Sequence, residues 1–136
     1  LLNHACDPNV VRHSVGDAVV ARAIRPIHAG EELVDNYGYH YAVMGREERH
    51  KSLQYQYFFT CTCPPCTYNW KKYSELTASD DISIPPNNPF EAAFKKVLNQ
   101  EDYSDEVQSV FVDFLEFLDR NYAHKRPFKE YNDCQE

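Results

Sequence analysis

Cysteine is the residue type whose spacing in this sequence most directly indicates chemistry. Cys61, Cys63 and Cys66 lie within one short run, Cys-Thr-Cys-Pro-Pro-Cys, too close for all three to pair with one another in unstrained disulfides. Thiolates at such spacing are typical ligands of zinc, which usually takes four ligands in a tetrahedron. The run offers three, so a distant segment must supply the fourth, and Pro64 and Pro65 stiffen the loop between the ligands. The sequence therefore predicts a Zn²⁺ ion that joins two distant segments.

The fourth ligand has one favoured candidate and three rivals. Cys6 is the best donor, because it lies far from the run and is itself a thiol. His4, His40 and His50 could also serve, although His50 is expected on the solvated face of a helix. With Cys6, the ion would hold the start of the chain against its middle.

Short strands are expected to position Cys6. Residues 18–24 are rich in alanine and β-branched valine and stop before Pro26, which cannot donate to a strand ladder. Glycines at 16 and 30 mark turns. The predicted strands span residues 9–13, 18–24 and 32–37.

A helix and an aromatic run are expected to position the other cysteines. Residues 45–55 are helical in pattern, with Glu47 and Lys51 four apart in the favourable order. The rings of Tyr55, Tyr57, Phe58 and Phe59 follow, directly before the cysteines. Such density of rings beside a metal site indicates a pocket wall, although each ring taken singly could merely cover the zinc ligands.

The last part of the chain is predicted to be helical. Residues 71–88 are poor in apolar side chains and contain Pro85-Pro86, as in a linker. One helix opens at Pro89-Phe90, with Phe90, Phe94, Val97 and Leu98 on one face. A second begins after Ser104, a suitable N-cap, and ends near 125–127. Together they predict a helical hairpin.

Composition limits the classes of partner. The net charge is −7, which disfavours broad binding to nucleic acid and suits a cationic protein or peptide. No apolar run is long enough to cross a membrane. Clustered thiols without a secretory signal favour a reducing compartment, cytoplasmic or nuclear, and Cys134 is expected to be a free thiol. The first and last residues suggest a fragment.

Several ordered segments resemble SET-domain protein lysine methyltransferases, most closely the SET and MYND domain group. The resemblance covers about residues 1 to 70 and rests on Asn3-His4-Ala5-Cys6-Asp7-Pro8-Asn9, Gly30-Glu31-Glu32-Leu33 with Tyr37, Glu47-Glu48-Arg49, Gln56-Tyr57-Phe58-Phe59 and the three-cysteine run. Tyr37-Gly38-Tyr39-His40-Tyr41 with Met44 is most similar to the branch with tetratricopeptide helices. The resemblance implies an α+β fold that begins with the C-terminal half of a SET domain (1–44) and a helix with the post-SET zinc segment (45–70). The linker (71–88) and the start of a helical region (89–136) follow from the composition and helical pattern, and this region is similar to the family's C-terminal helices only in character.

The same resemblance implies roles for individual residues. Asn3 and His4 match the pair that holds S-adenosylmethionine, and Phe59 matches the ring that packs on its adenine. Tyr37 matches the active-site tyrosine, and Tyr57 matches a wall of the lysine channel. The family's post-SET zinc ligands correspond to Cys6, Cys61, Cys63 and Cys66.

The implied activity is methyl transfer from S-adenosylmethionine to a protein lysine, on a histone or another substrate. The reaction needs a neutral amine, and a desolvated aromatic channel lowers the pKa of lysine from its usual value of about 10.4. The glycine-rich cofactor segment and the MYND module of the family would lie upstream, so the fragment is expected to be inactive alone. The alternative is a non-catalytic, zinc-stabilised SET-like module that binds protein partners through its helical region.

Overall fold

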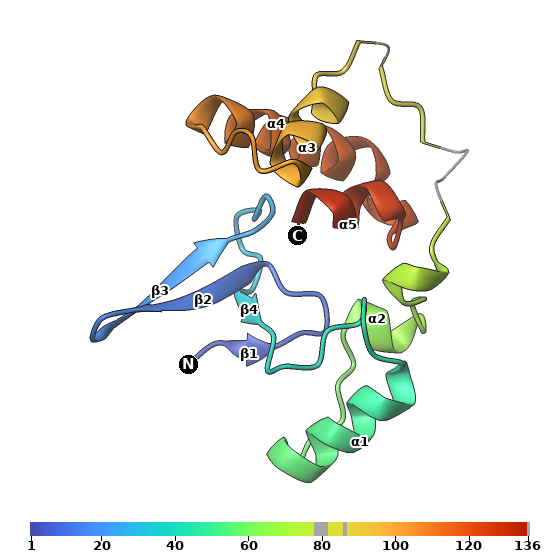
Figure 1. Cartoon of the computed structure of the whole chain (residues 1–136). Helices are drawn as coiled ribbons and strands as arrows, with labels where there is room; N and C mark the ends of the chain where they lie inside the picture. The colour runs from blue at the N-terminus through green and yellow to red at the C-terminus, as the bar shows by residue number, and fades with distance from the viewer. Residues whose placement is uncertain (78–81, 86, 136) are drawn as a thin grey trace. The chain divides into compact units, whose positions relative to one another are not determined.

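The computed structural model describes residues 1–77, 82–85 and 87–135, and the chain divides into two compact units (Figure 1). Unit 1 is Leu1–Leu76 and unit 2 is Thr77–Glu136. The division falls inside the segment predicted as a linker, of which residues 78–81 and 86 lie outside the described part. Short strands in unit 1 and helices in both units confirm the predicted α+β class. Within the described residues, no helix combines the length and apolarity needed to cross a membrane.

Two very short strands position the start of the chain. β1 (Asn3–His4) pairs in parallel with β4 (Val34–Asp35), with Asn3 opposite Val34 and His4 opposite Asp35. The predicted strand over 32–37 is therefore mostly wrong, because only two of its residues lie in a ladder. Neither the alternation in that segment nor the residues of β1 indicated this non-local pairing.

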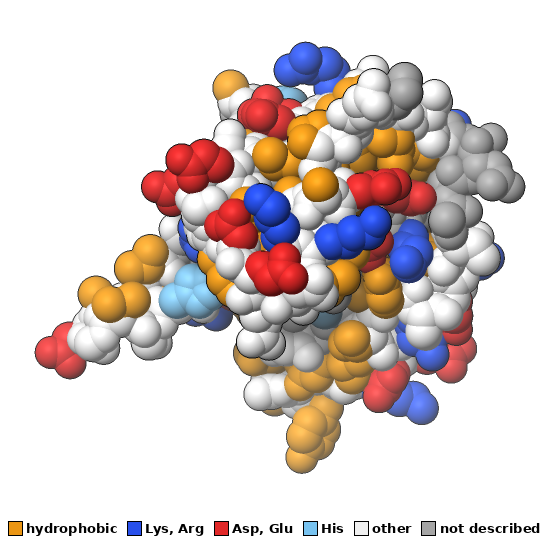
Figure 2. Space-filling view, turned by 45° about the horizontal axis from the view of Figure 1, so that its top comes forward, with side chains coloured by type: hydrophobic (Ala, Val, Ile, Leu, Met, Phe, Trp, Pro, Cys, Tyr) orange, Lys and Arg blue, Asp and Glu red, His pale blue; other side chains and the backbone are white. Residues whose placement is uncertain are grey.

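The two longer strands form a separate antiparallel ribbon. β2 (Val10–Val15) and β3 (Ala18–Ala23) are joined by a tight turn in which Gly16 has φ +58°, a conformation that favours glycine. Both strands were predicted to within two residues at each end. Hydrophobic side chains remain at the surface of this ribbon, as Figure 2 shows, with Val15 and Val19 more than 60% exposed.

Buried polar side chains hold the segments of unit 1 together. Asn9 is fully buried; its side chain accepts from the backbone N–H of Val34 at 2.8 Å and donates to the carbonyl of Glu32 at 2.8 Å. The backbone N–H of Ala5 donates to Asp35, and that of Tyr41 donates to Cys6. Residues near the start of the chain are thus tied to the segment after the ribbon by hydrogen bonds more than by apolar packing.

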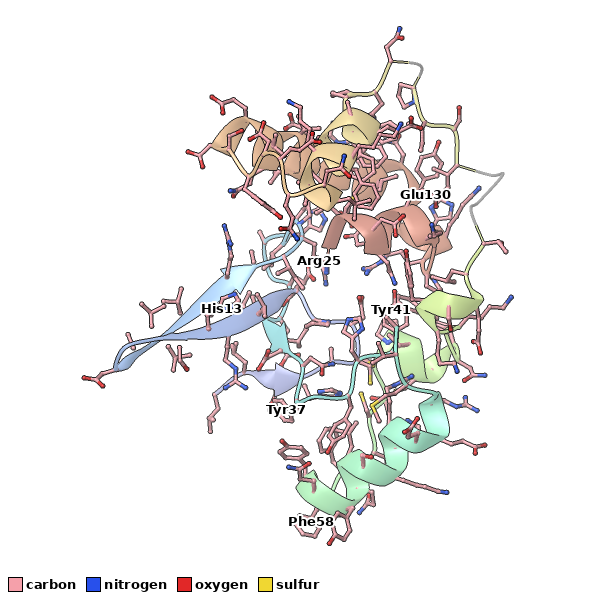
Figure 3. All side chains as sticks on the ribbon, in the orientation of Figure 1. His13, Arg25, Tyr37, Tyr41, Phe58 and Glu130 are labelled. Carbon is pink, nitrogen blue, oxygen red and sulfur yellow. The ribbon has the colours of Figure 1, made fainter. Side chains whose placement is uncertain are left out.

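The helix before the cysteines ends in a sharp reversal. α1 (Arg46–Tyr57) is capped by Phe58, which has a left-handed φ of +61° and donates its N–H to the carbonyl of Gln54 at 3.2 Å. This conformation is uncommon outside glycine and turns the chain sharply. Phe59 then leads into the cysteines, whereas the ring of Phe58 is exposed at the end of the helix (Figure 3).

Unit 2 is built from three helices around an apolar core. They are α3 (Phe90–Leu98), α4 (Asp105–Tyr122) and α5 (Lys129–Gln135), with the 3₁₀ turn η2 (Ala123–Lys125) after α4. α3 and α4 pack together as the predicted hairpin, and α5, which was not predicted, packs on α4. The core residues are Ile82, Phe90, Phe114, Leu115, Leu118, Phe128, Tyr131 and Cys134.

Two predictions about unit 2 have clear outcomes. Leu98 was expected on the apolar face of the first helix but is 64% exposed, because it is the last helical residue and lies beyond the packed stripe. Cys134 is a free thiol, as predicted, and it is buried in the core, where burial raises its pKa.

Candidate functional site

The four cysteines of the zinc prediction lie together in unit 1. The sulfur atoms of Cys6, Cys61, Cys63 and Cys66 all lie within 4.8 Å of one another (Figure 3 shows the sulfurs in yellow). The Sγ of Cys6 is 3.5 Å from that of Cys66 and 4.0 Å from that of Cys61. Zinc–sulfur bonds of about 2.3 Å in a tetrahedron require sulfur separations of about 3.8 Å. The donor set and its spacing therefore fit zinc.

A short helix positions two of these sulfurs. α2 (Pro64–Thr67) begins after Cys63, whose carbonyl accepts hydrogen bonds from the N–H groups of Cys66 and Thr67, both at 2.9 Å. Proline suits the first helical position because its missing N–H would have no partner there. The turn places Cys63 and Cys66 on the same side, and the hydroxyl of Thr67 donates to the carbonyl of Thr62 and closes the loop.

The electrostatics of the cluster favour a bound cation. Hydrogen bonds from Cys6 and Cys63 lower the pKa of Cys61 to about 2, whereas the hydrogen bond to Cys61 raises the pKa of Cys6. Burial raises the pKa of Cys66. Four sulfurs this close cannot all be thiolates without a positive charge among them. A divalent ion would stabilise all four in the ionised form that binds metal.

His4 links the sulfur cluster to Tyr37. Its Nδ1 accepts the backbone N–H of Tyr37 at 3.1 Å, and its Nε2 lies 3.4 Å from the Sγ of Cys6. Burial lowers the pKa of His4, which favours the neutral ring. A neutral imidazole has one acceptor and one donor nitrogen, so Nε2 holds the proton and donates toward Cys6. His4 is therefore placed to orient the sulfur of Cys6, a proposed zinc ligand, and not to bind the metal itself.

The other two histidines named as rivals lie outside the group of four. Nδ1 of His40 accepts the backbone N–H of Ala42, and Nε2 of His50 lies 3.1 Å from the carbonyl oxygen of Cys61. His50 is half-buried, so the expectation that it would be solvated is wrong. The helical pattern around His50 did not predict this contact, because the contact depends on the chain reversal at Phe58, which brings Cys61 back toward the helix.

Aromatic rings gather beside the sulfurs. The Tyr37 ring centroid lies 4.9 Å from that of Tyr57 and 5.1 Å from that of His4, and His4 lies 6.0 Å from Phe59. The hydroxyl of Tyr37 donates to the carbonyl of Leu2 at 2.6 Å. Tyr37, Tyr57 and Phe59, three rings predicted for the site, are thus brought together with His4 from three segments of the chain.

Asn3 is placed differently. Successive residues of a strand point to opposite faces, so the side chain of Asn3 points away from that of His4. Its amide nitrogen donates to Glu32 at 2.6 Å, and the residue is exposed. The structure therefore brings the backbone of Asn3 to the ring cluster but not its amide.

One residue beside the sulfurs was missed by sequence reasoning. Arg49 is fully buried in α1 and donates to the Sγ of Cys66 at 3.5 Å. It lies four residues before Leu53, the other fully buried residue of that helix, so the pair marks the inner face. The spacing from Leu53 could have indicated that Arg49 is buried. Because arginine is almost never fully buried, its residue type instead predicted a solvent-exposed side chain.

A surface hollow of about 510 Å³ lies at the start of α1. Its lining consists of Gly45, Arg46, Glu47, Glu48, Lys51 and Asn69. None of the predicted site residues lines it, so the candidate site is the ring and sulfur cluster.

Residues 1–38, which supply Cys6, His4 and Tyr37, match the family model of the SET domain. This segment of the chain is therefore similar to part of a SET domain. This confirms the family resemblance inferred from the ordered segments. The SET segment holds the early half of the ring and sulfur cluster, and the later half comes from residues after the matched range.

Relatives extend the similarity past the SET segment. The chain is 42% identical over 66 residues to the Homo sapiens protein-lysine N-methyltransferase SMYD4, covering 48% of this chain and 8% of the relative. It is 43% identical over 82 residues to the Mus musculus histone-lysine N-methyltransferase SMYD3, covering 60% of this chain and 19% of the relative. It is 34% identical over 86 residues to the Danio rerio N-lysine methyltransferase SMYD2-A, covering 63% of this chain and 19% of the relative. The chain thus spans no more than a fifth of the length of these relatives.

Proposed function

We propose that this chain supplies the lysine-facing and cofactor-facing residues of an S-adenosylmethionine-dependent protein-lysine N-methyltransferase. The observation that most supports this is the meeting of Tyr37, Tyr57, Phe59 and His4 beside the four sulfurs. Relatives named as lysine methyltransferases are 34–43% identical to this chain over 66 to 86 residues. The substrate would be a lysine-bearing protein, histone or not, in the cytoplasm or the nucleus.

Tyr37 is proposed to orient the reacting amine. Its hydroxyl hydrogen is committed to the carbonyl of Leu2, so toward a substrate the oxygen can only accept a hydrogen bond. A neutral lysine amine has N–H groups to donate, and accepting one of them fixes the direction of the nitrogen lone pair. Much of the rate gain in a direct displacement comes from such alignment.

The neighbouring rings are proposed to exclude water and favour positive charge. The face of Tyr57, next to Tyr37, would line the lysine side and lower the pKa of the amine by desolvation. When bound, S-adenosylmethionine would supply the methyl group of its sulfonium: the carbon–sulfur bond would break to leave a neutral thioether as the amine nitrogen takes the methyl, and the ammonium so formed would lose a proton to water. Phe59, His4 and Asn3 would hold this cofactor, with Asn3 acting through its backbone or after its amide leaves Glu32.

The four cysteines are proposed to hold a structural zinc ion. All four donors come from the protein, which leaves no open position for substrate, and this is the pattern of a structural site. The ion would fix Cys6 against the segment 61–66 and so close the cofactor side of the site. Elemental mass spectrometry is expected to find one zinc per chain, lost on treatment with a strong chelator.

Methyl transfer is tested in a polypeptide that carries the complete SET domain together with this chain. Labelled S-adenosylmethionine is incubated with candidate lysine proteins. Tyr37→Phe is expected to lower transfer by about 10²-fold through lost alignment. Tyr68→Phe is the matched control, because Tyr68 is 74% exposed at the end of α2 and away from the ring pairs. Equal transfer by both variants would remove Tyr37 from the site. This chain alone is expected to be inactive.

A non-catalytic, zinc-stabilised module that binds proteins through its helical unit is the second candidate. The position of the Asn3 amide, turned away from the rings and bonded to Glu32, favours it. Calorimetric titration separates the two: a zinc-loaded protein with the complete domain that binds no S-adenosylmethionine would support the module and contradict the enzyme.

A further inference from the structure

Arg49 has the largest side chain among the fully buried residues of the described chain, with 0% exposed surface. Removing a guanidinium group from water costs several kcal/mol unless it is well compensated. The guanidinium of arginine stays protonated in proteins, and Nη2 of Arg49 lies 3.5 Å from the Sγ of Cys66. The residue is therefore a buried cation whose counter-charge must be found nearby.

The contacts of Arg49 are unusual for a buried arginine. Its Nη1 donates to the carbonyl of Met44 at 2.5 Å, and its Nη2 lies 3.3 Å from the carbonyl oxygen of Pro65 and 3.5 Å from the Sγ of Cys66. Its buried Nε has no hydrogen-bond partner. Across the described residues, no carboxylate forms an ion pair with it. The sulfur cluster is the only source of negative charge in its contacts.

The charge of the sulfur cluster matches this need. Four thiolates around one Zn²⁺ carry a net charge of −2, and Cys6, Cys61 and Cys66 are at least 95% buried. A buried anion, like a buried cation, is costly unless it is paired, and each stabilises the other at hydrogen-bond distance. Four neutral thiols would leave Arg49 uncompensated, so its burial is independent support for thiolates at this site.

We propose that Arg49 is a positioning residue for the metal site, which balances its charge and fixes Cys66. The inference rests on the zinc ion proposed above. The planar guanidinium contacts three points at once: the turn before α1, the first turn of α2 and a ligand sulfur. A lysine at this position would keep the charge but lose the fork that makes these contacts simultaneously.

The test compares zinc release in the full chain and three variants. Zinc-loaded protein is mixed with a chromogenic chelator, and the release rate is followed by absorbance. Arg49→Met is expected to release zinc about 10–100-fold faster, the usual cost of removing a partner of a metal ligand. Arg49→Lys is expected to lie between Arg49→Met and the wild type. Arg46→Met is the matched control: Arg46 also lies in α1 and reaches the same residue, but at the carbonyl oxygen of Cys66, at 3.5 Å.

A cobalt spectrum supplies a second readout. In Co²⁺-loaded protein, the sulfur-to-cobalt absorption bands are expected to shift in Arg49→Met and Arg49→Lys, and to stay unchanged in Arg46→Met. If the wild type binds no zinc, the zinc proposal fails and this one fails with it. If the wild type holds zinc and Arg49→Met releases it no faster than Arg46→Met, the role of Arg49 is overturned and the zinc site stands. If Arg49→Met does not fold, Arg49→Lys serves as the test. A zinc release rate and a cobalt spectrum equal to those of the wild type in Arg49→Lys would also overturn the proposed role of Arg49.

Discussion

The two units of this protein are stabilised in different ways. Unit 2 has an apolar core of phenylalanine, leucine, isoleucine and tyrosine side chains between three helices. The buried hydrophobic cluster of unit 1 contains only Tyr41 and Leu53 besides three cysteines. Four polar or charged residues of unit 1 are also buried: Asp7, Asn9, Asp35 and Arg49. Unit 2 thus depends on apolar burial, and unit 1 depends on hydrogen bonds, buried charges and sulfurs.

This difference shows what the site requires of the fold. Apolar packing tolerates many substitutions of similar volume, whereas a buried polar group is costly once its partner is lost. Unit 1 places polar and sulfur-bearing side chains at defined points, which a site for chemistry needs. Its stability should therefore depend on a few partners, above all the proposed zinc ion, while the stability of unit 2 should not.

Removal of metal is the strongest test of this contrast. Structural zinc contributes apparent binding free energies of about 10–16 kcal/mol in small zinc-dependent peptides. A chelator is therefore expected to raise amide hydrogen exchange throughout residues 1–76, including the N–H of Tyr41, which is bonded to Cys6. The amides of α4 should keep their protection. Loss of protection in α4 to the same extent would show that the units are not separately stabilised.

A cavity in the helical core tests the other side of the contrast. Leu118 is fully buried in α4, and Leu118→Ala is expected to destabilise unit 2 by about 2–5 kcal/mol. The only tryptophan, Trp70, packs edge-on against Tyr41 at 5.0 Å in unit 1, so its fluorescence reports unit 1. In Leu118→Ala, the helical circular dichroism signal should be lost at a lower urea concentration than in wild type, while the urea midpoint of the tryptophan fluorescence transition should not change. Val112→Ala, at a residue of the same helix that is 53% exposed, is the control: it should not destabilise the helices, because alanine has the higher helix propensity, and it should leave the tryptophan transition in place.

The sequence predicted the parts of the fold that have local causes. The ribbon follows from β-branched residues and Gly16, α1 from its charge pattern, and α4 from Ser104 and the apolar stripe after it. The pairing of β1 with β4 could not be predicted, because two-residue strands have no periodicity and their partners lie about 30 residues apart. α5 was missed because seven residues give too short a pattern to recognise.

For the candidate site, the spacing of the three clustered cysteines and the density of rings before them were informative on their own, and the resemblance to a known family added Tyr37 and the roles of the rings. The structure brings these residues together, although their roles remain proposals. The direction of the Asn3 side chain depends on the strand register and could not be inferred from its residue type. Arg49 was missed because arginine usually prefers solvent, whereas this one is fully buried and contacts the Sγ of Cys66.

A smaller effect is expected from the carboxylate of Glu31 in unit 1. It pairs with Arg25 at 2.6 Å and accepts from the N–H of His28 and the side chain of Asn9, both at 3.1 Å. Burial alone would raise the pKa of Glu31, but these partners hold it at about 2. Glu31→Gln is expected to destabilise unit 1 by about 2 kcal/mol in urea unfolding followed by Trp70 fluorescence.

The pH dependence of this effect has a definite sign. The folded pKa lies below the unfolded value of about 4.3, so the stabilisation is complete above that value and is lost as the pH falls toward 2. The difference in free energy of unfolding between wild type and Glu31→Gln should therefore be the same at pH 7.5 and pH 6. Glu32→Gln is the control, because Glu32 is exposed, and a gap of equal size there would show that the partners of Glu31 add nothing.

The smallest expected effect is local to one helix end in unit 2. The hydroxyl of Ser104 accepts the N–H of Val107 at 3.4 Å and so satisfies one of the donors left free at the start of α4. Ser104→Ala is expected to cost about 1 kcal/mol, seen as an earlier loss of helical circular dichroism in urea with the Trp70 transition unchanged. Ser109→Ala, at an exposed position inside the same helix, should be neutral or slightly stabilising, because alanine has the higher helix propensity. If Ser104→Ala moved the tryptophan transition as much as the helical one, a local change in the helical unit would reach the sulfur cluster, and the separation of the two kinds of stability would have to be abandoned.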